Sequence, residues 1–548
     1  MYFNYILLIS LLTAVMMSGC EQQNHEEKQS KTQATEARHV GYLRLALSDN
    51  VRTLDPGLIY KNVEIEVVEQ LFLGLTDFDP KSYEVVPELA THWQVSSDGT
   101  VYTYKLRQDV KWTDGLPVTA HDVVWAIQRN IAKKTDSFYA FMLYVIKNAK
   151  AIHQEESLPI SSLGVRAIDD YTVEFTLEQP TSYFPALTSF WIYHPLPRHV
   201  IKSDGWVNFQ TNGSYQLVEW KKNQLLILKK NPDYYEADKV KIPEVHYYIV
   251  PDSSLGFAMY KKNELDIIGG QTYLPVPQSE MSNIKSNPVL RKEKRFNPQF
   301  CTEWYGFSVQ QPPLDNPLVR KAIAAAIDKK TLIDIVLKAN HLPAMTFTQP
   351  PVFGAVDPKA TKKVGIFFDP IDAKAWLAKA GYPEGKNFPQ LFLVHNGSEF
   401  HHETAKTVKT MLKHYLNINV EIRAFDFERY INILKQPTTP LIFRMVWCAN
   451  YPDAHDWLHH VFHPDKGINW IGWNNREFAK VVDKAERIYD PVVRRKLYRH
   501  AEKILTEKET AIIPLYFLNT PFLVKPWVKG WYHKGFGGQH IRHWSLEN

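Results

Sequence analysis

Segments with strand-like and helix-like patterns of apolar residues follow one another along the whole chain. The strand-like segments, which alternate or are apolar throughout, are Gly41–Ala46, Val101–Leu106, Asn419–Ala424, Leu441–Trp447, Ile512–Leu518 and two hairpins over 165–177 and 215–228. The helix-like segments, in which apolar residues recur with a period near 3.6, are Val63–Leu73, Ala120–Ile131, 318–328, 370–381, Glu403–Tyr415 and 491–508. Because the two kinds interleave, we predict an α/β fold.

Residues at the starts of the helical segments are suited to capping. Thr119 precedes Ala120–Ile131, and Asp122 stands in the first turn, where a carboxylate is favourable. Pro317 and Pro370 occupy first turns, where the N–H that proline lacks has no partner within the helix. These signals predict where the helices begin.

The first apolar segment, Tyr5–Met17, has the length of a signal-peptide core and is too short to span a membrane. It leads into Ser18-Gly19-Cys20, which resembles the lipobox of bacterial lipoproteins, although Met17 stands where leucine is usual and no Lys or Arg precedes it. We predict a lipoprotein signal peptide over 1–20, lipid attachment at Cys20 and a flexible polar tether over 21–39. A simple membrane-anchoring start is the alternative, and both place the body of the chain outside the cytoplasm.

Composition and charge bear on the number of domains and on the kind of partner. The 548 residues are 45% hydrophobic and 13% aromatic, which is enough core material for two or three domains. The net charge of +5 is small and the basic residues form no stripe, so nucleic acid is not an expected partner. Cys301 and Cys448 form a disulfide if the compartment is oxidising, and two buried free thiols are the alternative.

Several motifs occur in a fixed order along the chain. The longest runs from Asp98 to Ala126 (DGTVYTYKLRQDVKWTDGLPVTAHDVVWA). The others are Leu54-Asp55-Pro56, TNGSY at 211–215, NPDYY at 231–235, VRKAI at 319–323 and LVKPW at 523–527. Together they resemble the family 5 extracellular solute-binding proteins, which are receptors of bacterial ABC importers. Trp447-Cys448-Ala449 with Cys301 is similar to the oligopeptide-binding branch, and this similarity implies a disulfide between the two cysteines.

The resemblance implies a fold like that of the type II periplasmic binding proteins, with two hinged lobes that close over a ligand and an extra third domain. By analogy, lobe I comprises 40–72, 197–300 and 519–548, the extra domain 73–196, and lobe II 301–518. The implied function is capture of a small peptide, an oligopeptide or a cell-wall peptide, for an inner-membrane ABC permease and its ATPase subunits. We expect a monomer in the periplasm or cell envelope, without catalysis or cofactor.

The same resemblance implies which residues contact the peptide. Receptors of this branch bind the ligand backbone as an added strand, and the matching segments here are Tyr60-Lys61-Asn62 and Val446-Trp447-Cys448. Arg444, a charge in an otherwise apolar strand, and His401 match positions near the ligand carboxylate, and Tyr139 matches an aromatic contact to its first residue. Ordinary structural roles are the alternatives, and for Arg444 this is an ion pair with a carboxylate of its own lobe.

Asn450 departs from the family pattern. Oligopeptide receptors have Asp at this position, and its carboxylate pairs with the free α-amino group of the peptide. A buried ammonium without a counter-ion costs several kcal/mol. Three alternatives follow: Asp453 or Asp456 supplies the charge, the ligand lacks a free α-amine, or Asn450 offers only its carbonyl oxygen to a weakly bound peptide.

Two other functions stay open as alternatives. His455 and His459 are four residues apart and share a helix face, as the zinc ligands of H-E-x-x-H hydrolases do. Asp456 stands where the catalytic glutamate would be, and no third ligand is evident in the sequence. A receptor for a metal complex or haem is the second alternative, because Trp447, Trp470 and Trp473 suit a bulky, planar ligand, with core packing as the simpler role for these side chains.

Overall fold

The computed structural model describes residues 41–547 apart from 156, 203, 204, 207, 271, 338, 339, 362 and 436–439. The predicted signal peptide, Cys20 and the predicted tether lie outside the described residues. Within the described ranges, no helix combines the length and the hydrophobicity that a membrane crossing requires.

One mixed sheet of eleven strands runs through the described part of the molecule, in the order β10-β11-β12-β1-β13-β19-β14-β18-β16-β17, with β15 beside β19. Its strands are β1 (Leu43–Leu47), β10 (Tyr215–Lys221), β11 (Leu225–Lys230), β12 (Glu244–Ile249), β13 (Ile267–Gly269), β14 (Lys294–Phe307), β15 (Leu342–Pro343), β16 (Leu391–Asn396), β17 (Val420–Phe425), β18 (Leu441–Cys448) and β19 (Ile512–Val524). Parallel pairs such as β1 with β12 occur beside antiparallel ones, which agrees with the predicted α/β class.

A second sheet of four strands, in the order β4-β5-β7-β6, lies in the predicted extra domain. Its strands are β4 (Ala90–Val95), β5 (Val101–Leu106), β6 (Val165–Asp169) and β7 (Thr172–Thr176). Three two-stranded sheets pair β2 (Thr76–Phe78) with β3 (Val85–Pro87), β8 (Ile201–Lys202) with β9 (Gly205–Trp206), and β20 (Val528–Lys529) with β21 (Ser545–Leu546).

The α-helices pack on the faces of these sheets. They are α2 (Asn62–Leu71), α3 (Ala120–Ile131), α4 (Phe184–Leu187), α5 (Ser253–Lys261), α6 (Met281–Ser286), α7 (Pro288–Glu293), α8 (Pro317–Ala325), α9 (Lys329–Thr331), α10 (Pro370–Lys379), α11 (Glu399–Leu416), α12 (Phe427–Lys435), α13 (Ala454–Phe462), α14 (Arg476–Arg487) and α15 (Pro491–Lys503). Buried residues of α8, α10 and α11 form one core, and those of α12 to α15 form another on the opposite face of β14, β16 and β18. A separate core joins α2, β1 and β12 to the second sheet.

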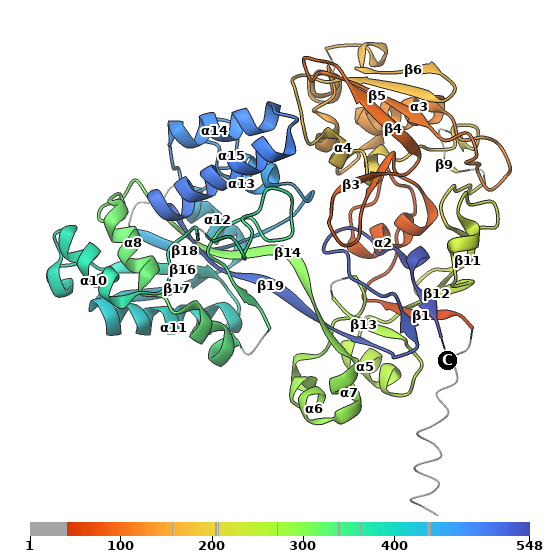
Figure 1. Cartoon of the computed structure of the whole chain (residues 1–548). Helices are drawn as coiled ribbons and strands as arrows, with labels where there is room; N and C mark the ends of the chain where they lie inside the picture. Colours follow the sequence, from red (N-terminus) through yellow and green to blue (C-terminus); the bar gives the residue numbers. More distant parts are fainter. Residues whose placement is uncertain are drawn as a thin grey trace, which may run out of the picture.

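The long strands β14 and β19 connect the two halves of the molecule (Figure 1). They pair in antiparallel register, but the register shifts between Pro298 and Thr302 of β14. A sheet bends more easily where its ladder is interrupted. Because each half has its own core, this interruption marks the place where one half can bend relative to the other.

Local sequence signals predicted some helix boundaries well and missed others. The predicted helix Ala120–Ile131 has these bounds, and Thr119 forms a capping box with Asp122 at its start. The prediction for 318–328 is wrong at its end, because α8 stops at Ala325. Asp328 instead caps the next short helix by accepting a hydrogen bond from the Thr331 amide.

A disulfide joins Cys301 to Cys448, and the alternative of two free thiols is wrong. The two residues are direct neighbours in the ladder between β14 and β18, and the bond closes a loop with a sequence separation of 147. Loop-closure entropy predicts that the C301A/C448A double variant loses about 3–5 kcal/mol of unfolding free energy. Urea unfolding of both proteins under oxidising conditions tests this, and a loss of less than about 1 kcal/mol would contradict the entropic argument.

Glu66 of α2 is fully buried and gives the fold a pH dependence. It accepts hydrogen bonds from the hydroxyls of Tyr247 and Tyr273 and from the Gln539 amide, yet burial raises its pKa from 4.5 to about 7. Between these two pH values the unfolded chain releases a proton that the folded chain keeps, so the free energy of unfolding falls as the pH rises.

The difference in unfolding free energy between wild type and Glu66→Gln isolates this group. We expect the wild type to lose up to about 3 kcal/mol relative to the variant between pH 4.5 and pH 7. Urea unfolding at half-unit pH steps measures the difference, and a difference that does not change over this range would contradict the assignment.

Candidate functional site

A cleft lies between the two halves, above the interrupted part of β14 and β19, and contains a cavity of about 160 Å³. Residues of both halves and of the hinge strands line it: Asn62, Ile65, Tyr139, Met142, Phe190, Trp191, Gly270, Thr272, Gln299, Phe300, Cys301, Cys448, Ala449, Asn450, Thr520, His533, Lys534, Gly535, Phe536 and Gly537. A ligand in this cleft contacts both halves at once, so it can stabilise a closed arrangement.

Asn450 lines the cleft with a carboxylate directly behind it. The Asn450 backbone amide donates to Asp456 Oδ2 at 2.8 Å, and its side-chain Nδ2 donates to Asp456 Oδ1 at 2.9 Å. The Trp447 indole Nε1 donates to Asp456 Oδ2 at 3.2 Å. Burial raises the pKa of Asp456 to about 7, although these donors favour the charged form. Because Nδ2 is directed to Asp456, the amide oxygen is the atom of this side chain left to accept a hydrogen bond from a ligand.

Asp453 is engaged elsewhere. Its Oδ1 accepts a hydrogen bond from the His455 amide at the start of α13, and it pairs with Arg494 Nη2 at 2.9 Å. The Asp453 and Arg494 side chains are 6% and 5% exposed. Of the two carboxylates that the sequence analysis considered beside Asn450, only Asp456 contacts it.

Arg444 and His401 lie together in the second half, away from the residues that line the cavity. Arg444 forms a bidentate ion pair with the buried Glu303, which stands opposite Val446 in the β14–β18 ladder. Asn396 connects the two predicted residues, because its side chain accepts from Arg444 and its carbonyl oxygen bonds to the His401 ring. Burial, and then the nearby guanidinium, lower the pKa of His401 to about 4.

The predicted contacts from the first half are divided between the cleft and its rim. Asn62 and Tyr139 line the cavity, and the Tyr139 ring packs edge-on against Trp191 at a centroid distance of 5.2 Å. Tyr60 is 40% exposed beside them, and Lys61 makes an exposed ion pair. The structure therefore brings Asn62, Tyr139, Cys448 and Asn450 together.

The segment 533–537 lines the cleft although no sequence motif indicated it. Lys534 is buried there, 3.2 Å from Glu69 Oε2 and 3.0 Å from His540 Nε2. The Phe536 ring stacks on Phe300 of β14 at a centroid distance of 5.7 Å. These contacts connect the C-terminal segment to the hinge, and they depend on tertiary packing that no local pattern reveals.

The alternatives to a peptide site fit the structure less well. The Asp456 carboxylate contacts Asn450 and Trp447, so it is not placed to act as a base beside His455 and His459. Trp473 is buried and packs against Phe478, while Trp470 lines a separate pocket near Gln310. Neither indole lines the cleft.

The family model of bacterial extracellular solute-binding proteins, family 5, matches residues 84–469. The periplasmic oligopeptide-binding protein OppA of Salmonella typhimurium is 32% identical over 491 residues, which cover 88% of each chain. The probable deoxycholate-binding periplasmic protein YgiS of Escherichia coli is 31% identical over 497 residues, covering 87% of this chain and 88% of that protein. This chain belongs to the family 5 bacterial extracellular solute-binding proteins.

Solved structures agree with this assignment and indicate the state of the cleft. The unliganded open form of the murein tripeptide-binding protein MppA matches with a TM-score of 0.84 at 28% identity, covering 92% of this chain and 97% of that one. The Haemophilus influenzae OppA complex with the peptide RPPGFSPFR matches with a TM-score of 0.63 at 26% identity, covering 92% and 99%. The two matches have nearly equal sequence identity and coverage. The higher TM-score for the unliganded open form therefore indicates that the two halves of this protein are open.

Proposed function

We propose that this protein is an exported receptor that captures small peptides between its two lobes and delivers them to the permease and ATPase subunits of an ABC transporter. The family assignment and the relatives named for oligopeptide and murein tripeptide binding support this. We extend the proposal to a monomer held at the cell envelope by lipid on Cys20, with no catalytic activity. The proposed lobe boundaries at 300/301 and 518/519 fall in or beside the interrupted part of the β14–β19 ladder.

The pair of Asn450 and Asp456 is the observation that carries the proposal. A peptide ammonium donates to the Asn450 amide oxygen, and Asp456, one side chain further away, provides the negative charge. The nearby ammonium favours the ionised form of this carboxyl, whose pKa burial otherwise raises to about 7. Asp456 accepts a hydrogen bond from Asn450 Nδ2. This bond polarises the amide, so the Asn450 amide oxygen becomes a stronger acceptor for the ammonium. A free α-amino group is therefore recognised through two residues in place of one.

The other end of the peptide has a weaker partner. The backbone of the ligand adds as a strand beside Tyr60–Asn62 and Val446–Cys448, and its carboxylate extends toward Arg444 and His401. Because Glu303 already neutralises Arg444, we expect the carboxylate to contribute less binding free energy than the amine.

Native mass spectrometry of the gently purified protein, followed by denaturation, identifies what it carries. Calorimetry with trialanine, N-acetyl-trialanine and trialanine amide then tests the two ends. We expect trialanine amide to bind nearly as well as trialanine and the acetylated peptide to bind much more weakly. We also expect the radius of gyration of the protein, measured by solution scattering, to decrease when a peptide binds. A receptor that carries no peptide, binds none of the three and does not close would falsify the proposal.

A receptor for a non-peptide ligand is the second candidate. The relative named as a probable deoxycholate-binding protein is nearly as similar as the oligopeptide-binding relative. Aromatic residues such as Trp191, Phe300 and Phe536 line the cleft, and they suit an apolar ligand as well as a peptide side chain. The same mass-spectrometric experiment distinguishes the two candidates by the mass of the released molecule.

A further inference from the structure

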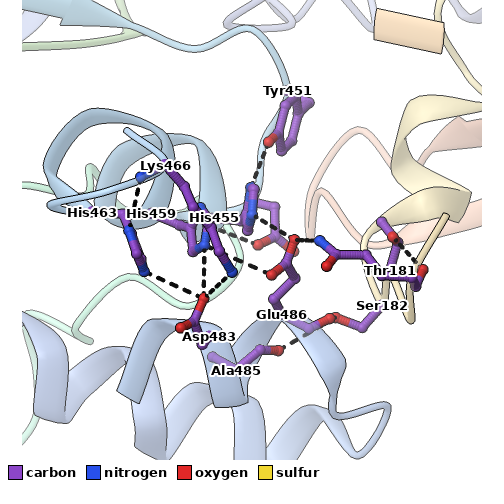
Figure 2. A network of polar contacts seen from close by, with 12 residues as sticks. Thr181, Ser182, Tyr451, His455, His459, His463, Lys466, Asp483, Ala485 and Glu486 are labelled. Atoms are coloured by element: carbon purple, nitrogen blue, oxygen red, sulfur yellow. Dashed lines mark hydrogen bonds and ion pairs between the residues drawn. The ribbon is translucent and has the colours of Figure 1, made fainter. Parts of the chain in front are cut away.

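A ladder of three histidines faces two carboxylates outside the peptide cleft (Figure 2). His455 and His459 lie on α13, and His463 directly follows it. The rings of His455 and His459 stack at a centroid distance of 4.6 Å, and those of His459 and His463 are tilted at 4.7 Å. Asp483 and Glu486 lie opposite them on α14. Spacing by four residues explains why the imidazoles align on one face.

Three polar atoms in this cluster are buried without a hydrogen-bond partner. His455 is 5% exposed and Glu486 2%. Among the residues that the structure describes, His455 Nε2, His463 Nε2 and Glu486 Oε2 have no hydrogen-bond partner. Buried polar atoms are nearly always paired, so the unpaired atoms of His455 and Glu486, which belong to one group of candidate ligands, indicate a bound ion.

The other ring nitrogen of His455 has a hydrogen-bond partner of its own. Its Nδ1 lies 2.6 Å from the Tyr451 hydroxyl. In the tautomer with the proton on Nδ1, the ring donates to this hydroxyl and Nε2 keeps its lone pair for a metal ion, and such an outer contact orients the ligand.

The spacing of the ligand atoms suits a metal ion. Atoms that bind Zn²⁺ tetrahedrally at about 2.0–2.1 Å lie roughly 3.3 Å from one another. Glu486 Oε1 is 3.5 Å from His455 Nε2, and Glu486 Oε2 is 3.7 Å from His459 Nε2. One ligand atom from each residue lies within 4.8 Å of the other two. We propose that His455, His459 and Glu486 bind a divalent transition-metal ion, with Zn²⁺ suited to two imidazoles and a carboxylate.

His463 and Asp483 have a different role. His463 Nδ1 accepts hydrogen bonds from the Asp465 and Lys466 amides at 3.1 and 3.0 Å, so its proton is on Nε2. That nitrogen lies 3.4 Å from Asp483 Oδ1, which also accepts from Lys466 Nζ at 2.6 Å. A carboxylate neutralised in this way is a poor metal ligand. On metal binding, the His459 ring proton moves from Nε2 to Nδ1 by exchange with solvent, and Nε2 gives up its contact with Asp483 Oδ1 at 3.2 Å.

The metal site joins parts that are distant in the sequence. Gln179 Nε2 donates to Glu486 Oε1 at 2.9 Å, and the Tyr183 ring stacks on His455 at a centroid distance of 4.0 Å. Both residues belong to the proposed extra domain, whereas α13 and α14 belong to the proposed lobe II. A bound ion therefore stabilises the contact between these two parts, and its role is structural.

Metal uptake by the full chain tests this inference independently of peptide binding. Protein dialysed against EDTA is titrated with ZnCl₂ by calorimetry, and its zinc content is measured after gel filtration. We expect one Zn²⁺ per chain, and at least a tenfold loss of affinity in Glu486→Gln and in the His455→Gln/His459→Gln double variant. Asp483→Asn, which makes a similar change on the same helix, does not lower the affinity, because it only removes the contact that competes for His459 Nε2. His414→Gln, on an exposed face of α11, keeps the wild-type affinity.

Two results overturn the proposal: wild type that takes up no stoichiometric zinc, or an affinity that Asp483→Asn lowers and Glu486→Gln does not. Anomalous diffraction at the zinc edge from wild-type crystals decides the matter if a variant fails to fold. A peak between α13 and α14, in contact with His455, His459 and Glu486, supports the site, and a peak elsewhere or no peak contradicts it.

Discussion

Replacing Asp456 by asparagine weakens binding of trialanine about 100-fold, because the substitution removes the negative charge behind Asn450. The peptide ammonium then enters the cleft with only a neutral amide to accept its hydrogen bonds. N-acetyl-trialanine has no charge at this end. We therefore expect its affinity, which is already low for the wild type, to change little in the Asp456→Asn variant. Isothermal titration of both peptides against both proteins measures the difference in selectivity.

The acetylated peptide also controls for damage to the segment between Trp447 and Asp456, since Asp456 accepts hydrogen bonds from Trp447 and Asn450. An equal loss of affinity for both peptides shows that Asp456 acts only by holding the loop. Unchanged affinity for trialanine shows that the charge is unused. Asn450→Asp is the complementary variant, and we expect it to accept the free amine directly.

Asp453→Asn lowers the free energy of unfolding by about 3–5 kcal/mol, because it leaves the buried Arg494 guanidinium without its counter-ion. Asparagine keeps the shape of the side chain and is a good N-cap residue, so the α13 cap is preserved and the loss reports the charge. Arg494 also donates to the Ala485 carbonyl and the Tyr498 hydroxyl, and neither neutral group replaces the carboxylate. Urea unfolding of the two proteins measures the loss.

Asp490→Asn is the matched control, because Asp490 caps α15 in the same way but is exposed and has no ion pair among the described contacts. We expect a change of less than about 0.5 kcal/mol there. Similar losses in the two variants contradict the argument from buried charge. Adding Arg494→Met to Asp453→Asn should recover part of the loss, since the unpaired charge is then absent.

The sequence was sufficient for many separate elements but not for the way the two halves are connected. The strand Val101–Leu106 and the helix Ala120–Ile131 have their predicted bounds, because local periodicity and capping decide them. The strand predicted over Ile512–Leu518 continues to Val524, and β14 was not predicted. Both strands cross from one core to another, so their apolar pattern changes along the strand, and periodicity in a short window cannot follow them.

The candidate site was predictable only in part. Resemblance indicated Asn62, Tyr139, Cys448 and Asn450, which line the cleft. Sequence could not decide between Asp453 and Asp456, because the choice depends on where the first turn of α13 directs each carboxylate. Nor could it find Glu486 as a partner of the histidines, since that residue lies on a different helix and only packing brings the two helices together.

The interrupted ladder between β14 and β19 has a consequence for recognition by the transporter. Paired strands on either side of the interruption keep their hydrogen-bonded register, so they resist sliding of one half past the other when the ladder bends. The halves therefore meet in the same relative orientation whatever side chains the cargo has. We expect the permease to recognise this constant outer shape, so that one transporter serves cargo of many sequences.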